Sequence, residues 1–506
     1  MPSNSTREPI LKGPLPNFLV IVLDAARWSD FPGVGHANGV RMPFVEDLEA
    51  KSVVFPRATA PSPWTIPSHA SLFTGLYPWE TGCHRRAKVD LNPTIPTLTE
   101  LLRPEGYRSL SASSNGLVSP TFGLTRGFDA VAWGDWWEKL LQIPGRVLPP
   151  HSDGAGPALN TPTGRWWRRA GNAAYASFRY PITLNLAGHL ASHLRLPGEE
   201  FRPHCHPWVE STVSRWLRTQ PADRPVFCFV NLHDTHEPYL TARHRNEPLT
   251  AFFRRAMTRM DQSGFVSGKW VPRADEIEVL HELYRETYRD MDDRIRAVVE
   301  SFVRSGRWEN TVMVLTSDHG QEFVENGFLF HGFRVSDELL RIPMILRLPE
   351  SLGITGRAKG WASLIDVAPT FQSLLGQPTT SPWGVPLLRL LDADRETPVL
   401  AMGDGFDESS GLASACPPER RRFWNHAYAV AYEGSMKVLM DLEANRVSAF
   451  DVDQDPHEKT DVSEVAASAN PGLFRRVQDL AQTIGSGSSS QTGPREVDDR
   501  LSSWGY

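Results

Sequence analysis

The sequence predicts an α/β protein with a large, mostly parallel central sheet, helices on both faces of that sheet, and a small C-terminal α+β subdomain. Four apolar runs, at 18–23, 225–230, 311–315 and 342–348, have the continuous hydrophobic character of strands buried on both faces. Predicted helical segments lie between the first three of these runs, as in sheets built from crossover connections. After about residue 376 the texture changes to alternating, turn-rich sequence, which is typical of antiparallel strands.

The other elements follow in order along the chain. Residues 1–16 are expected to form a loose leader, and residues 17–375 the large catalytic domain. Short strands are predicted at 52–55 and 107–112, and helices at 43–50, 96–102, 208–217, 275–304 and 363–375. Residues 376–482 are assigned to the small C-terminal subdomain, with its strands within 423–452. The Gly- and Ser-rich end, 483–506, predicts a flexible tail.

Two insertions interrupt the catalytic domain, at about 133–210 and 240–272. The first holds clusters of Trp and Arg and a predicted helix at 170–193. That helix fits either an amphipathic surface helix or a lid over an apolar leaving group. Because both insertions are irregular, the sequence does not define the alcohol part of the substrate that they are expected to select.

Composition excludes several classes of protein. The 506-residue chain has a net charge of -6 and no basic stripe, so nucleic acid is not an expected partner. Its four cysteines lie far apart, which argues against a disulfide scaffold and a zinc knuckle. No apolar signal core opens the chain, and no run approaches the roughly 18 apolar residues of a membrane span. We therefore expect a cytoplasmic enzyme without a membrane span; no feature indicates its oligomeric state.

The chain is organised around the stretch at 60–75. Thr65 stands two residues before Pro67, and a run of small and apolar residues follows, which predicts the start of a helix. The Thr65 hydroxyl would then lie beside free backbone N–H groups at the positive end of a helix dipole. Thr65 is either a helix cap or a group placed where negative charge develops.

Acids and imidazoles follow two of the predicted strands. Asp24 ends the first run, and Asp318 and His319 follow the third, so all three should emerge at one edge of the sheet. With the Thr65 hydroxyl they suit a divalent cation such as Mn²⁺, Zn²⁺ or Mg²⁺. Singly, Asp24 fits a helix cap and the Asp318-His319-Gly320 segment a tight turn; together they predict a metal site. Coordination would depress the hydroxyl pKa and make Thr65 a nucleophile.

The number of metal ions is a separate question. Asp234, with His233 or His236, could begin a second site after the predicted strand at 225–230. Bracing of its own loop is the alternative role for Asp234. We favour one metal ion.

The chain resembles the sulfatase branch of the alkaline phosphatase superfamily over most of 17–375. The matching pieces are Val22-Leu-Asp24, the block from Thr65 to Pro78, Gly106-Tyr-Arg-Ser, His236-Glu-Pro-Tyr, Ser317-Asp-His-Gly320, His331-Gly and Arg341-Ile-Pro. The resemblance implies that one divalent ion (Mn, Zn, Mg or Ca) is held by Asp24, Asp318 and His319, with Thr65 as the metal-bound nucleophile. It implies that His236 contacts the substrate or protonates the leaving oxygen, and that His331 does similar work.

Four departures from the family pattern bear on the reaction. Sulfatases carry Cys or Ser at the Thr65 position, converted to formylglycine, and Arg at the His69 position. Thr cannot be converted, so no formylglycine is expected. The Asp-Asp pair after the first strand is Asp24-Ala25, and the family's sulfate-gripping Lys is replaced by Asn115, a neutral substitute donor. His69 and Asn115 are therefore the candidate substrate-binding residues.

The nucleophile decides between three hypotheses. A hydrated aldehyde sheds its sulfate by breaking its own C–O bond, whereas a threonine ester needs direct attack by water or an alcohol. Threonine nucleophiles in the superfamily belong to phosphoryl-transfer members, such as lipoteichoic acid synthases, nucleotide phosphodiesterases and phosphopentomutases. The first hypothesis is thus a metal-dependent hydrolase or phosphotransferase acting on small-molecule phosphate esters through a phosphothreonine intermediate. The alternatives are a sulfatase using unmodified Thr and a non-catalytic ligand-binding protein on the same scaffold.

Overall fold

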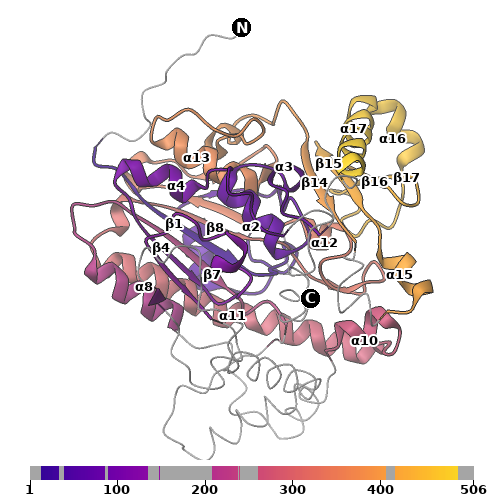
Figure 1. Ribbon diagram of the computed structural model, residues 1–506, viewed down its shortest axis with the longest axis horizontal. Helices are drawn as coiled ribbons and strands as arrows, with labels where there is room; N and C mark the ends of the chain where they lie inside the picture. Colours follow the sequence, from indigo (N-terminus) through magenta and orange to yellow (C-terminus); the bar gives the residue numbers. More distant parts are fainter. Residues whose placement is uncertain are drawn as a thin grey trace, which may run out of the picture.

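A nine-stranded mixed sheet forms the centre of the protein (Figure 1), with the strand order β12-β2-β11-β8-β1-β7-β4-β5-β6. The computed structural model describes residues 13–33, 39–85, 89–134, 147–148, 208–237, 239, 260–405 and 416–487. The strands are β1 (Asn17–Leu23), β2 (Val53–Val54), β4 (Arg108–Ser113), β5 (Ala130–Trp133), β6 (Val147–Leu148), β7 (Val226–Leu232), β8 (Thr311–Ser317), β11 (Met344–Arg347) and β12 (Gly356–Arg357).

The central strand β1 lies between β7 and β8 and runs parallel to both. Strands β4 and β5 extend the parallel part of the sheet beyond β7. These pairings confirm the predicted α/β class with a mostly parallel sheet. The predicted fourth strand, β11, instead runs antiparallel to β8, with Met344 opposite Thr316. The connection from β8 turns back at the same sheet edge, where Gly320 N–H donates to the Leu339 carbonyl at 2.8 Å, so β11 starts where β8 ends.

Helices cover both faces of the sheet, as predicted, because alternate residues of β1 enter different cores. Leu19, Ile21 and Leu23 pack with one helix layer: α1 (Pro43–Glu49), α8 (Trp208–Thr219) and α11 (Ala274–Arg304). Phe18, Val20 and Val22 pack with the other: α2 (Thr65–Thr74), α4 (Leu98–Leu102) and α13 (Val367–Leu374). Every β1 side chain is fully or almost fully buried. The run therefore lacks hydrophobic alternation because neither face of this strand meets water.

An antiparallel sheet forms the C-terminal part of the chain. Its strands are β14 (Val399–Gly403), β15 (Tyr428–Glu433), β16 (Met436–Asp441) and β17 (Arg446–Asp451), in that order. Helix α17 (Pro471–Gly487) packs on it through Leu473, Val477 and Ile484. The small α+β subdomain expected from the sequence is therefore present at the right of Figure 1.

Two predicted boundaries differ from the structure. The helix predicted at 363–375 begins only at Val367, because Ala362–Ser363 pair with β3 (Ala58–Thr59) and a 3-10 turn intervenes. Helix α17 continues four residues past the expected start of the tail, because Ile484 is still buried. Most of each insertion lies outside the described residues, including the helix predicted at 170–193. Residues 1–12 of the predicted leader also lie outside them.

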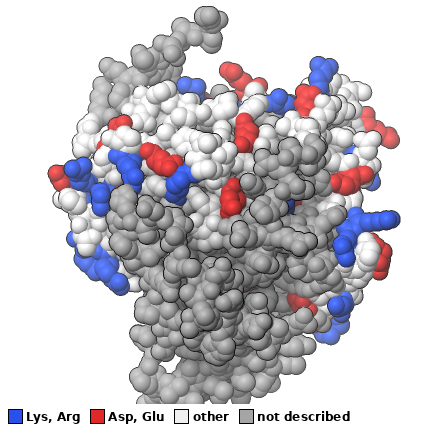
Figure 2. All heavy atoms as spheres, viewed as in Figure 1, with Lys and Arg blue, Asp and Glu red and all other residues white. Residues whose placement is uncertain are grey.

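Surface charge is mixed in sign on the face shown in Figure 2, where basic and acidic side chains alternate over the described residues. None of the helices in the described part of the chain is long and apolar enough to cross a bilayer.

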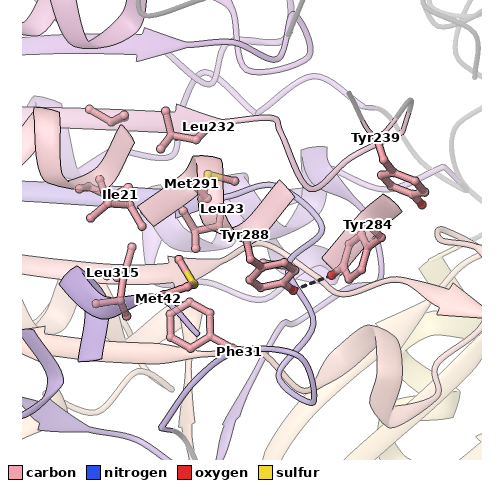
Figure 3. Close-up of a cluster of buried hydrophobic side chains, with 14 of the residues drawn as sticks. Ile21, Leu23, Phe31, Met42, Leu232, Tyr239, Tyr284, Tyr288, Met291 and Leu315 are labelled. Carbon is pink, nitrogen blue, oxygen red and sulfur yellow. Dashed lines mark hydrogen bonds between the residues drawn. The ribbon is translucent and has the colours of Figure 1, made fainter. Parts of the chain in front are cut away.

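Two buried tyrosines hold the turn that follows β1 (Figure 3). Tyr284 and Tyr288 project from α11 and share a hydrogen bond of 2.7 Å. The Arg27 backbone N–H donates to the Tyr284 hydroxyl at 2.7 Å, and that hydroxyl donates to the Ala25 carbonyl at 2.8 Å. Ala25 has φ 62°, a left-handed backbone conformation that residues other than glycine rarely adopt. The tyrosines therefore stabilise a strained turn directly beside Asp24.

Substitution of Tyr284 by Phe should lower the free energy of unfolding by about 2 kcal/mol, because the buried Ala25 carbonyl loses its donor. Urea unfolding followed by circular dichroism measures the loss. Tyr107→Phe is the matched control, since the buried Tyr107 hydroxyl makes a single 2.7 Å hydrogen bond, to the Pro16 carbonyl. If Tyr284→Phe costs no more than Tyr107→Phe, the turn does not depend on this hydroxyl.

Candidate active site

Asp24 and Asp318 lie side by side at the carboxyl edge of the sheet. The β1–β8 register places Leu23 opposite Ser317, so the next residue of each strand is an acid. The Ala25 and His319 backbone N–H groups donate to Asp318 Oδ1, at 3.1 and 2.9 Å. Both acids are fully buried. The parallel pairing therefore brings together two carboxylates that are nearly three hundred residues apart in the sequence.

A helix does start at this stretch, as predicted, but Thr65 is the first residue of helix α2 and Trp64, not Thr65, is its N-cap. The helix ends at Gly75, whose φ of 73° suits glycine, and each of its residues is buried. The Thr65 hydroxyl oxygen lies 3.5 Å from His319 Nε2. The first backbone N–H groups of a helix have no partner within the helix, so the hydroxyl stands at its positive end.

Asp24, Asp318 and His319 offer donor atoms that all lie within 4.8 Å of one another. Asp24 Oδ1 and Asp318 Oδ2 are buried and accept no hydrogen bond from the described residues. Burial raises the pKa of Asp24, and the neighbouring Asp318 raises it further. Burial also raises the pKa of Asp318 to about 7, and burial lowers the pKa of His319 to about 4. The site thus offers two buried carboxyls, each with one oxygen that lacks a hydrogen-bond donor, and one neutral imidazole. A divalent cation would bind to such a set of donor atoms.

The two predicted substrate-binding residues make contacts within this cluster. Asn115 Nδ2 donates to Asp24 Oδ2 at 2.7 Å, and Asn115 Oδ1 accepts from the Leu117 N–H at 2.8 Å. His69 Nδ1 lies 2.9 Å from the Thr65 carbonyl, and its Nε2 lies 3.4 Å from Asn231 Nδ2. Burial lowers the pKa of His69, so the ring is neutral. A neutral ring at this position donates Nδ1–H to the carbonyl and accepts at Nε2 from Asn231.

His236 and His331 lie beside the cluster, with ring centroids 4.8 Å apart. The His331 ring is also 4.5 Å from that of His319. Burial opposes protonation of His236, but Glu237, Asp24 and Asp318 raise its pKa overall. Burial and the neighbouring His319 and His236 hold the pKa of His331 well below its usual range. The two imidazoles thus sit in electrostatically different surroundings.

Asp234, the candidate start of a second metal site, forms an ion pair with Arg294 of α11. Arg294 also pairs with Glu210 of α8. This contact corresponds to the bracing role, because it ties the loop after β7 to the helix layer. The groups that do gather near the first cluster are His233 and His236 with Asp24, and Glu237 with His236 and His331.

Three residues of the site were not identified by the sequence analysis. Asn231 is the last but one residue of β7 and contacts both Asp24 and His69. Glu237 follows His236, and Gln321 lies two residues after His319. The two side chains join their loops, with Gln321 Nε2 donating to Glu237 Oε2 at 3.0 Å. The place of Asn231 at a strand's carboxyl end is the signal that would have found it. Nothing in the sequence links Glu237 with Gln321, because only the fold brings them together.

Comparisons with known proteins agree with this geometry. The sulfatase family model matches residues 16–377, more than half of the chain. Choline-sulfatase of Rhizobium meliloti is 25% identical over 478 residues, covering 89% of this chain and 85% of its own. The uncharacterized sulfatase YidJ of Escherichia coli is 23% identical over 373 residues, covering 71% and 67% of the two chains.

Solved structures share the fold. The phosphonate monoester hydrolase of Agrobacterium radiobacter superposes with a TM-score of 0.62 at 18% identity, covering 93% of this chain and 96% of its own. A 2-O glycosaminoglycan sulfatase gives the same TM-score at 15% identity, covering 96% of each chain. Sulfatases generally bind a divalent metal ion. The chain belongs to the sulfatase family and is a hydrolase of the sulfatase/alkaline phosphatase superfamily.

Proposed function

We propose that this protein is a metal-dependent hydrolase or transferase of small-molecule phosphate esters that acts through Thr65 and a covalent phosphothreonine. The observation that carries the proposal is the position of the Thr65 hydroxyl. Thr65 is the buried first residue of helix α2, and its hydroxyl oxygen lies 3.5 Å from His319 Nε2. His319 belongs to the cluster with Asp24 and Asp318, each of which has one carboxylate oxygen without a hydrogen-bond donor among the described residues. No cysteine or serine stands at this position for conversion to formylglycine.

One divalent ion would be held by Asp24, Asp318 and His319, with Thr65 beside it. When bound, such an ion supplies Lewis acidity and lowers the pKa of a neighbouring hydroxyl. Asn115 and Asn231 orient the Asp24 carboxylate through its Oδ2, which leaves Oδ1 facing the site. The Ala25 and His319 N–H groups orient Asp318 in the same way, leaving its Oδ2. Backbone and amide donors thus fix which oxygen of each carboxylate is offered.

The protein's own residues then divide the reaction. Thr65 Oγ1 attacks phosphorus in line as the bond from phosphorus to the substrate's alcohol oxygen breaks, while the helix terminus stabilises negative charge. The proton of the Thr65 hydroxyl passes through the imidazoles of the site and ends on the leaving alcohol. His236 or His331 protonates the leaving oxygen, and water or an acceptor alcohol resolves the ester with the help of an imidazole base. The substrate-binding roles of His69 and Asn115 remain predictions, since both side chains also have protein partners.

Charge around the nucleophile favours a singly charged ester group. In place of the family's Arg and Lys, the site carries His69, whose pKa is lowered by burial, and neutral Asn115. Fewer fixed cations suit a monoanion, such as a phosphodiester, better than a phosphomonoester dianion. A sulfate ester is also a monoanion, and the curated relatives are sulfatases. A sulfatase using unmodified Thr is therefore the second candidate.

Intact-mass analysis after mixing with phosphodiester substrates should detect a phosphoryl adduct on Thr65. Thr65→Ala should abolish both the adduct and turnover, because it removes the nucleophile. Thr74→Ala is the matched control: it lies in the same buried helix, and its hydroxyl bonds only to local backbone groups. An adduct on another residue, or full activity in Thr65→Ala, would refute the mechanism.

A panel of phosphodiesters, phosphomonoesters and sulfate esters separates the two candidate reactions. We expect the highest kcat/KM for a phosphodiester. Sulfate turnover that exceeds phosphate turnover would replace the proposal with the sulfatase candidate.

Asp318→Asn should remove most of the bound metal, measured by elemental analysis of the purified protein, because it replaces a charged ligand with a neutral one. Chelation should lower the melting temperature of the unaltered protein but not that of the variant. Asp234→Asn is the control: it should cost about 3 kcal/mol of stability by breaking a buried pair, yet keep the metal. If Asp234→Asn loses the metal while Asp318→Asn keeps it, the metal does not bind at Asp24, Asp318 and His319.

A further inference from the structure

The side chain of Gln321 lies between His331 and the loop after β7. Its Nε2 is 3.0 Å from Glu237 Oε2 and 2.5 Å from the Tyr239 hydroxyl, and its Oε1 is 2.7 Å from His331 Nδ1. A carboxylate oxygen only accepts hydrogen bonds, so the end of Gln321 that faces Glu237 must be the NH₂ group. The amide orientation is therefore fixed by chemistry, and the carbonyl end faces His331.

That orientation determines where the His331 ring carries its proton. An amide oxygen only accepts, so the 2.7 Å contact requires an N–H at His331 Nδ1. The carboxylate oxygen Glu237 Oε2 lies farther away, 3.9 Å from the same nitrogen, and it too can only be an acceptor. In a neutral imidazole with its proton on Nδ1, Nε2 carries a lone pair and no hydrogen.

The other nitrogen of His331 is available for chemistry. Nε2 is buried and has no hydrogen-bond partner among the described residues. The ring as a whole is 2% exposed and lies against the rings of His319 and His236. A buried lone pair beside the candidate nucleophile's cluster can accept a proton but, in this tautomer, has none to donate.

We infer that Gln321 is a positioning residue that fixes His331 in the Nδ1–H tautomer, so that His331 Nε2 is the proton acceptor when the Thr65 ester is resolved. The inference rests on the proposed function, which left open whether His236 or His331 acts as the acid or the base, and it assigns one role to each. His236 then falls to the acid role. Its Nδ1 donates to the Glu237 carbonyl at 2.9 Å, so the acid form of His236 is the doubly protonated ring, which gives up its Nε2–H.

The resolving step balances with these groups. The oxygen of water or of an acceptor alcohol bonds to phosphorus as the bond from phosphorus to Thr65 Oγ1 breaks. The proton of the attacking hydroxyl passes to His331 Nε2, and the imidazolium returns it to the departing Thr65 oxygen. One water or alcohol is consumed, the phosphate product is released, and the threonine hydroxyl and neutral His331 are restored.

The tautomer can be observed directly. In protein labelled with ¹⁵N in its histidine rings and loaded with Mg²⁺, the two ring nitrogens of His331 should show a protonated Nδ1 and a bare Nε2. His331→Asn assigns the signals. Gln321→Met should shift the population toward the Nε2–H form that free imidazole side chains prefer. A proton on Nε2 in the unaltered protein overturns the inference, and this measurement needs no variant of Gln321.

Rapid quenching and intact-mass analysis test the role of the lone pair. In Gln321→Met the Thr65 adduct should form at nearly the unaltered rate but break down about 10²-fold more slowly, so it accumulates. Gln372→Met is the matched control. Gln372 is a buried residue of helix α13, and its amide oxygen accepts from the Thr380 backbone N–H. It should leave both rates unchanged.

The outcomes separate the two proposals. An adduct that breaks down equally fast in Gln321→Met and in the unaltered protein overturns the assignment of His331 as the base. The absence of any adduct, together with the expected tautomer, instead refutes Thr65 as the nucleophile.

Discussion

The repulsion between two buried carboxylates, Asp24 and Asp318, is the constraint around which this site is built. Parallel pairing of β1 with β8 places them at one sheet edge, where both are fully buried. Two adjacent negative charges at low dielectric are costly unless a cation or a proton intervenes. Burial raises the pKa of both carboxyls, and Asp318 raises that of Asp24 further. The surrounding groups do not neutralise the pair; they orient it and leave one oxygen of each residue unsatisfied.

The rest of the fold holds this unfavourable arrangement in place. Tyr284 and Tyr288 of α11 fix the left-handed turn at Ala25, and the helix layer behind them is continuous with the hydrophobic core of β1. The Arg294 pair with Asp234 secures the neighbouring loop to the same helix. A buried ion pair adds little net stability, but removing one partner is costly, so such pairs define geometry. One long helix therefore supports two of the loops that form the site.

Each of three histidines around the carboxylates has its Nδ1 against an oxygen acceptor. His69 is tied to the Thr65 carbonyl and to Asn231, His236 to the Glu237 carbonyl, and His331 to Gln321. All three partners at Nδ1 are oxygen acceptors, so each ring carries a proton on Nδ1. The rings differ at Nε2, which lies near Asn231 in His69 and has no partner among the described residues in His331. His69 and Asn115, the two predicted substrate-binding residues, bring no fixed positive charge to this part of the site.

The sequence alone was sufficient for the class of fold, the strand ends that carry Asp24 and Asp318, and the start of helix α2 at Thr65. Those features are local, since apolar runs, Pro67 and strand-end acids are written in consecutive residues. It left open what strand pairing decides: β11 runs antiparallel to β8, and Ser363, predicted as the first residue of a helix, joins a strand. Only the tertiary structure brought Asn231 to Asp24 and Gln321 to His331, because hydrogen bonds between distant loops leave no periodic signal in a chain. The residue types present were thus readable from the sequence, whereas proton positions depend on neighbours that folding supplies.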